Sequence, residues 1–224
     1  MKKAFELIVF DWDGTLMDSQ QRILDCLKAA ALDCDATILT DIEFSNVIGL
    51  GLKEATKSLY PDFTPQQAAT YAERFRSHYL IKNKTHSPLF SGAREILQTL
   101  KDQGYWMAVA TGKGRQGLDL VLNESGLGSF FLTTRSASET FSKPHPQMLE
   151  EIMYELAIEP EQTLMIGDTE YDMQLAKNAR THSLAVSYGV HSLERLLKYQ
   201  PLGYIDQIQQ LPEWLANQSS ANPQ

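Results

Sequence analysis

The 224-residue chain contains only two cysteines, Cys26 and Cys34, which lie eight residues apart in a stretch that reads as helix. A disulfide within one helix is geometrically implausible, and no set of Cys and His has the spacing of a zinc site. The sequence therefore predicts two reduced thiols and no structural zinc, as is usual in the cytoplasm.

The chain also lacks a run of about 18 apolar residues, so no membrane-spanning helix is predicted. Lys2 and Lys3 precede an apolar stretch, but Glu6, Asp11 and Asp13 interrupt any signal-peptide core. Basic residues are also outnumbered, since the chain has 20 Lys and Arg against 28 Asp and Glu, a formal net charge of -8. This excess of acid argues against an extended surface for nucleic acid or anionic membranes. We therefore expect a cytoplasmic protein without nucleic-acid or membrane partners.

Hydrophobic residues make up 43% of the chain, enough for a sizeable core. One apolar run, residues 5–10, reads as a short buried strand and ends abruptly at Asp11 and Asp13. Two carboxylates beside a buried segment must be solvated or paired with positive charge. This pair raises the question of what the two side chains do.

Residues 18–87 are predicted to form an all-helical insert after this strand. The helical patterns within it lie at residues 23–32, 52–60 and 66–80. Thr64 is placed to cap the last of them, with Pro65 at its first position.

From residue 91 the pattern alternates between helix and strand. The predicted helices are residues 91–104 (with a serine start), 114–126, 145–158 and 170–180. The predicted strands are residues 106–111, 130–134, 163–168 and 183–189. Such alternation predicts an α/β fold, a Rossmann-like, mostly parallel sheet with helices on both faces. We expect residues 1–17 and 88–216 to form this core, and residues 217–224 to be a frayed polar tail.

Four polar side chains are expected to converge at one edge of the sheet. Asp11, Thr111 and Asp168 follow or end predicted strands, and Lys143 lies in a loop just before a helix. Ligands of open α/β sheets bind at the carboxyl ends of the strands. The insert leaves the core at the same edge, where it could act as a lid.

A cation is needed if these carboxylates share a cleft, because Asp11, Asp13, Asp168 and Asp172 would otherwise repel one another. Oxygen ligands of this kind suit Mg²⁺. A lysine ammonium and a threonine hydroxyl beside them can bind phosphoryl oxygens. Together these groups predict a phosphoryl-transfer site.

Four motifs carry a resemblance to a known family: DWDGT (residues 11–15), VATGK (109–113), SKPHP (142–146) and GDTEYD (167–172). In this order they resemble the motifs of the haloacid dehalogenase superfamily. The helical insert is similar to that superfamily's first type of cap. The arrangement most resembles the phosphoglycolate phosphatase and β-phosphoglucomutase-like branch.

The resemblance implies a role for each matching residue. Asp11 is the nucleophile that forms an aspartyl-phosphate, and Asp13 protonates the leaving oxygen and then activates water. Mg²⁺ is held by Asp11, the backbone carbonyl of Asp13, and Asp168. Thr111 and Lys143 bind phosphoryl oxygens.

Three further residues receive implied roles. Asp172 orients a metal-bound water and so belongs to the metal site. Backbone amides near Trp12 and Gly112 can donate to phosphate. Gly14 permits a tight turn beneath the site.

Simpler interpretations exist for several of these residues. Thr111 could be an ordinary strand-end hydroxyl and Lys143 a solvated loop lysine. Asp168 could cap the following helix, and Asp172 could be a first-turn aspartate favoured by the helix dipole. In the insert, Lys53 could meet an anionic leaving group or, with Lys57, form a solvated helix face. The sequence is compatible with both roles of Lys53.

The leading functional hypothesis is a Mg²⁺-dependent phosphatase of small phosphate monoesters, such as phosphoglycolate-like compounds or sugar phosphates. The near alternative is a phosphomutase of the same fold. A signalling receiver domain is less favoured, because receivers run to about 120 residues without such an insert. A catalytically silent phosphate-binding module is also less favoured, since no motif residue is missing. The expected partner is a small phosphorylated metabolite, bound by a monomer or homodimer.

Overall fold

The computed structural model describes residues 3–220. Residues 1–2 of the predicted core and residues 221–224 of the predicted tail lie outside the described residues. Its centre is a six-stranded sheet in which every pairing is parallel, in the order β3-β2-β1-β4-β5-β6. The strands are β1 (Leu7–Phe10), β2 (Trp106–Thr111), β3 (Thr133–Ser136), β4 (Thr163–Gly167), β5 (His182–Val186) and β6 (Tyr204–Ile205). The expected α/β fold is confirmed.

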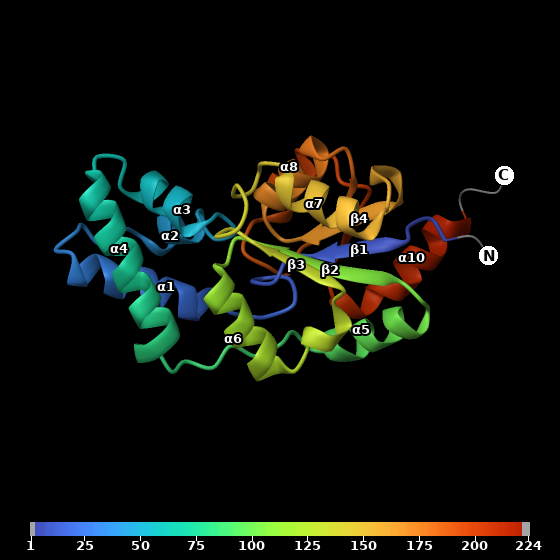
Figure 1. Ribbon diagram of the computed structural model, residues 1–224, viewed down its shortest axis with the longest axis horizontal. Helices are drawn as coiled ribbons and strands as arrows, with labels where there is room; N and C mark the ends of the chain where they lie inside the picture. Colours follow the sequence, from blue (N-terminus) through green and yellow to red (C-terminus); the bar gives the residue numbers. More distant parts are fainter. Residues whose placement is uncertain (1–2, 221–224) are drawn as a thin grey trace.

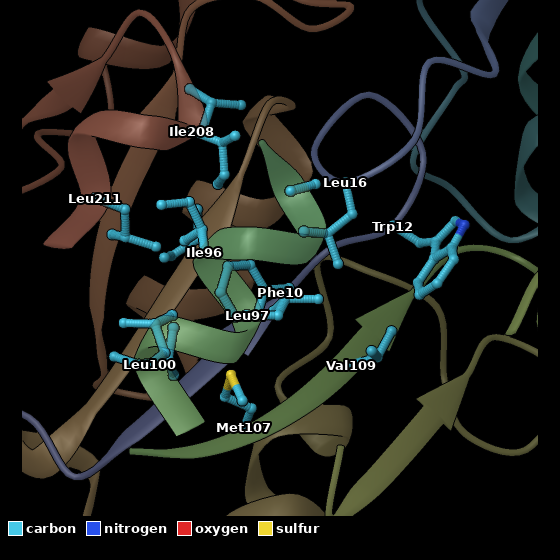
Figure 2. Packing of buried hydrophobic residues seen from close by; sticks show 14 of the residues in the cluster. Phe10, Trp12, Leu16, Ile96, Leu97, Leu100, Met107, Val109, Ile208 and Leu211 are labelled. Carbon is cyan, nitrogen blue, oxygen red and sulfur yellow. The ribbon is translucent and has the colours of Figure 1, made fainter. Parts of the chain in front are cut away.

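Strand β1 lies at the centre and is buried on both faces, which explains its continuous apolar sequence. Ile8 and Phe10 pack on one face, in a cluster with residues of α5 (Ala93–Asp102), α6 (Arg115–Ser125) and α10 (Leu211–Ser220) (Figures 1 and 2). Leu7 and Val9 pack on the other face, against α7 (Gln147–Leu156) and α8 (Glu170–Asn178) (Figure 1). A short helix, α9 (Leu193–Leu197), packs against β5, the strand next to the edge strand β6.

The helical insert has a hydrophobic cluster of its own and stands beyond one end of the sheet (Figure 1, left). Its elements are α1 (Gln20–Asp33), α2 (Asp41–Ser45), α3 (Leu52–Leu59), α4 (Pro65–Ser77) and a π-helical turn, η1 (His78–Lys82). Thr64 caps α4 and Pro65 occupies its first position, as predicted.

The two chain segments that connect the insert to the core run side by side. The Asp18 amide donates to the Pro88 carbonyl (2.8 Å), and the Phe90 amide donates to the Leu16 carbonyl (3.0 Å). Both connections therefore leave the core at one point, beside the carboxyl end of β1.

Some predicted boundaries are wrong. The strand expected at residues 130–134 begins only at Thr133, because Phe130 ends a 3₁₀ turn, η2 (Gly128–Phe130). Phe130 and Phe131 are partly buried and pack on the core before the strand begins. The helix expected to start at Ser91 starts at Ala93, after Gly92 in a left-handed conformation (φ 82°). Helix α10 continues into the expected tail, to Ser220. The elements that the sequence did not predict are α2, α9, β6, α10 and the short turns η3 (Pro160–Gln162) and η4 (Ile208–Gln210).

Both cysteines are free. Within residues 3–220, no helix is both long and apolar enough to cross a membrane.

Candidate active site

The carboxyl ends of the two central strands carry the predicted acidic cluster. Asp11 follows β1 and Asp168 follows β4, its neighbour in the sheet, while Asp172 lies in the first turn of α8. One carboxylate oxygen from each of the three lies within 4.8 Å of the others, and all three side chains are buried. Parallel register brings the first two together, and the helix that follows β4 brings the third.

Lys143 supplies positive charge to this cluster from the loop before α7. Its ammonium lies 2.8 Å from Asp11 Oδ1 and 2.5 Å from Asp172 Oδ1. With 1% of the residue exposed, Lys143 is not a solvated loop lysine. Burial by itself lowers the pKa of Lys143, but the two carboxylates outweigh it and hold the pKa above its usual value.

Asp168 accepts hydrogen bonds from the Thr15 hydroxyl and the Val190 amide, both at 2.8 Å. The DWDGT turn packs directly against it. Gly14 has φ +81°, and a side chain there would lie 2.2 Å from Asp168 Oδ2. Glycine is thus required at this position by both backbone conformation and space.

The three buried carboxylates of the triad lie beside one buried ammonium, that of Lys143, and the pKa values of Asp11 and Asp168 reflect their burial and this excess of negative charge. Burial raises the pKa of Asp11 to about 7, against the opposing effect of Lys143. Burial and the nearby charges of Asp11 and Asp172 also raise the pKa of Asp168 well above its ordinary value. Oδ2 of Asp11 is buried without a hydrogen-bond partner among the described residues. The cluster therefore carries an excess of negative charge that a bound cation would balance.

Asp172 also has a structural role. Its Oδ2 accepts from the Thr169 amide (2.9 Å) and hydroxyl (2.7 Å), closing a capping box at the start of α8. Thr169, rather than Asp168, is therefore the helix cap. The other oxygen of Asp172 faces Lys143, so the cap interaction fixes a residue of the cluster.

Asp13 does not belong to the carboxylate triad, although its side chain lies close by and the residue is 7% exposed. Its Oδ1 accepts from the Ser19 hydroxyl (2.5 Å), and its Oδ2 forms an ion pair with Lys113 (3.0 Å). Asp11 and Asp13 thus face different partners.

Thr111, Gly112 and Trp12 complete the set of predicted residues. Thr111 ends β2, is 1% exposed, and accepts from the Lys113 amide (3.2 Å). The indole of Trp12 belongs to the hydrophobic cluster (Figure 2). Its Nε1 donates to Met17 Sδ at 3.4 Å. Only the backbone of Trp12 is therefore available to a ligand.

A cavity of about 650 Å³ lies between the core and the insert. Asp11, Asp13 and Thr111 line it from the core, and α1, α3, α4 and η1 line it from the insert. The wall of the cavity includes Lys53 but not Lys57. The structure therefore distinguishes two lysines that the sequence pattern could not distinguish.

The loop between α2 and α3 closes against the core beside this cavity. A side chain on Gly112 would lie 2.3 Å from the Gly49 carbonyl oxygen, so only glycine lets the two backbones approach. The Gly51 amide donates to Ser142 Oγ at 2.7 Å.

Three residues of the site were not predicted from the sequence: Lys113, Tyr79 and Ser19. Lys113 belongs to the VATGK motif, and its place just past the end of β2 could have indicated it. Tyr79 had no indication in the sequence, because its hydrogen bond to Lys113 (2.7 Å) joins residues 34 positions apart.

Comparison with known proteins agrees with this geometry. Residues 8–186 match the family model described as haloacid dehalogenase-like hydrolase. The Dickeya dadantii protein named "Probable phosphatase IndB" is 30% identical over 204 residues, covering 89% of each chain. A Vibrio vulnificus protein named phosphoglycolate phosphatase is 26% identical over 218 residues, covering 94% of this chain and 96% of its own.

Solved structures show the same fold. A crystal structure described as a predicted phosphoglycolate phosphatase from Haemophilus somnus superposes with a TM-score of 0.85 at 23% identity, covering 94% of this chain and 98% of the other. A hydrolase from Pseudomonas syringae gives 0.86 at 22% identity, covering 95% and 98%. The family match spans the whole site from Asp11 to Asp172, and we conclude that the chain belongs to the haloacid dehalogenase-like hydrolase family.

Proposed function

We propose that the protein is a Mg²⁺-dependent phosphatase that hydrolyses small phosphate monoesters through an aspartyl-phosphate on Asp11. The observation that carries this proposal is that Asp11 and Asp13, two residues apart, lie in different environments. Asp11 lies in a buried triad with one free oxygen, and Asp13 stands beside it, outside the triad, at the cavity. Relatives named as phosphatases support hydrolysis rather than transfer.

The residues of the triad fit Mg²⁺. Carboxylate oxygens are its preferred protein ligands, and three carboxylates facing one ammonium leave an excess of negative charge. Asp11, Asp168 and the backbone carbonyl of Asp13 would hold the ion, with Asp172 beside it. Bound there, the metal supplies positive charge to phosphoryl oxygens.

The chain's own residues account for the rest of the mechanism. The free oxygen of Asp11 attacks phosphorus, while Lys143 and the Thr111 hydroxyl bind phosphoryl oxygens. Asp13 gives its proton to the leaving oxygen as the bond of that oxygen to phosphorus breaks. In the second step, Asp13 takes a proton from water as that water attacks the phosphoryl group on Asp11, and the bond between phosphorus and the Asp11 oxygen breaks to release phosphate.

We further propose that residues 18–87 act as a cap domain over this reaction, joined to a core of residues 1–17 and 88–216. Support comes from the separate hydrophobic cluster of the insert, the adjacent connections and the close approach at Gly112. In this position the insert excludes water from the reacting groups. Lys53 is placed to meet an anionic part of the leaving group.

The function is tested by turnover of the purified protein against a panel of sugar, nucleotide and organic-acid phosphates with Mg²⁺. We expect hydrolysis of at least one monoester, and a loss of about 100-fold or more in EDTA, because the metal's charge is worth several kcal/mol in the transition state. Ca²⁺ should replace Mg²⁺ poorly, since its coordination is larger and looser. Undiminished turnover in excess chelator would contradict the proposal.

Thermal unfolding should report the metal independently of turnover. The raised pKa values of Asp11 and Asp168 mean that the folded, metal-free chain retains protons that the unfolded chain releases. Their contribution to stability is therefore present below the unfolded pKa of about 3.9 and is lost as pH rises toward 7. Saturating Mg²⁺ should raise the Tm by about 5–10 °C at pH 8 and by much less at pH 5.

Two variants control this measurement. Asp168→Asn should lose the Tm shift, whereas Asp18→Asn, an exposed aspartate outside the triad, should keep it. A shift of equal size at both pH values, or one that Asp168→Asn retains, would place the bound ion elsewhere.

A further inference from the structure

The carboxylate of Asp13 is held at both oxygens. Ser19, which precedes α1, donates to Oδ1 at 2.5 Å. Lys113 contacts Oδ2 at 3.0 Å, and the two side chains are only 6% and 10% exposed. These contacts fix the plane of the carboxylate and thus the direction in which it can exchange a proton.

Lys113 is in turn held by the insert. Its ammonium lies 2.7 Å from the Tyr79 hydroxyl and 4.3 Å from the centre of the Tyr79 ring. Tyr79 belongs to η1, the last element of the insert before the chain returns to the core. A buried ammonium has few ways to compensate for a lost partner, so the tyrosine restricts where Lys113 can lie.

Tyr79 is fixed from its other side by Arg22. This arginine, in the first turn of α1, donates to the Tyr79 carbonyl (2.8 Å), and its guanidinium lies 4.6 Å from the ring centre. The ring of Tyr79, 4% exposed, therefore contacts one cation from the insert and one from the core. The two ends of the insert, α1 and η1, thus meet at the residue that holds Lys113.

We propose that Tyr79 is a positioning residue that acts through Lys113 on Asp13, so that proton transfer to the leaving oxygen depends on the insert resting against the core. The inference rests on the proposed phosphatase function. In the step concerned, the O–H bond of Asp13 breaks and its proton goes to the leaving oxygen as the P–O bond breaks. The insert then does more than cover the cavity, because it orients the acid.

The leaving group separates this role from a merely structural one. A p-nitrophenolate leaves without a proton, whereas a phenolate needs one, and the two phosphate esters are similar in size. Tyr79→Phe removes the hydroxyl and keeps the ring that contacts Arg22. We expect kcat/KM to fall about 10-fold for phenyl phosphate and less than about 2-fold for p-nitrophenyl phosphate, as part of the acid's contribution is lost.

The matched control is Tyr71→Phe. Tyr71 is also a buried tyrosine of the insert, but its hydroxyl donates to the Leu27 carbonyl (3.0 Å), away from Asp13. This variant should leave the ratio of the two kcat/KM values unchanged. Equal losses on both esters in Tyr79→Phe would show a structural role or a role in substrate binding, and would overturn the proposal.

A double-mutant cycle tests whether the effect passes through Lys113. In Lys113→Met, the further change Tyr79→Phe should alter the ratio less than about 1.5-fold, since the coupling partner is gone. Independent, multiplicative effects would contradict the proposal even if each single variant is impaired. Wild-type turnover of both esters tests the phosphatase function itself, so failure of that function is seen separately.

Discussion

Replacing Asp11 by asparagine is expected to lower kcat by about 10⁴-fold or more, while the protein stays folded. The amide has no anionic oxygen to attack phosphorus, so the first covalent step is lost. The substitution is nearly isosteric, and Lys143 retains Asp172 as a partner at 2.5 Å. Removing one of three crowded carboxylates also relieves repulsion in the metal-free state.

The measurement is steady-state hydrolysis of p-nitrophenyl phosphate with Mg²⁺, together with thermal unfolding of the same samples. Asp18→Asn makes the same chemical change seven residues along the chain, at an exposed position, and should keep wild-type turnover. An Asp11→Asn protein that turns over within about 10-fold of wild type would remove Asp11 from the role of nucleophile.

Local pattern was enough to predict the acidic cluster, because its position follows from strand ends. A parallel sheet brings the carboxyl ends of its strands to one edge, so Asp11 and Asp168 meet once β1 and β4 are neighbours. The same argument failed for residues 130–134. Phe130 and Phe131 have strand-like apolarity, but they are partly buried and pack on the core from a 3₁₀ turn and the residue after it, and packing on the core alone does not determine the backbone conformation.

The contact of Lys113 with Tyr79 could not be predicted, since it depends on how the insert docks on the core. Tyr79 and Lys113 are brought together by packing of η1 near α6, not by any periodicity in the chain. Sequence pattern also could not separate Lys53 from Lys57, which lie one helical turn apart, until the cavity wall was known. Tertiary docking therefore decides the part of the site that faces the substrate.

Asp13→Ala should divide the reaction into a surviving first step and a stalled second step. With p-nitrophenyl phosphate the leaving group needs little protonation, so Asp11 can still be phosphorylated. Hydrolysis of that intermediate needs a base near the attacking water and should slow by about 10²–10⁴-fold. The expected trace is a burst of nitrophenol of one equivalent or less, followed by almost no turnover.

The burst should also leave a covalent phosphoryl group on the protein, which can be detected directly. Mass spectrometry of protein quenched after the burst should find one phosphoryl group on the peptide that contains Asp11. Because Asp13→Ala leaves the buried ammonium of Lys113 without its carboxylate, Asp13→Asn serves as the second variant, keeping an acceptor for Lys113 but no base. Both variants should show the burst and the label. Steady turnover at the wild-type rate, or a label on another peptide, would contradict the two-step mechanism and the division of labour between Asp11 and Asp13.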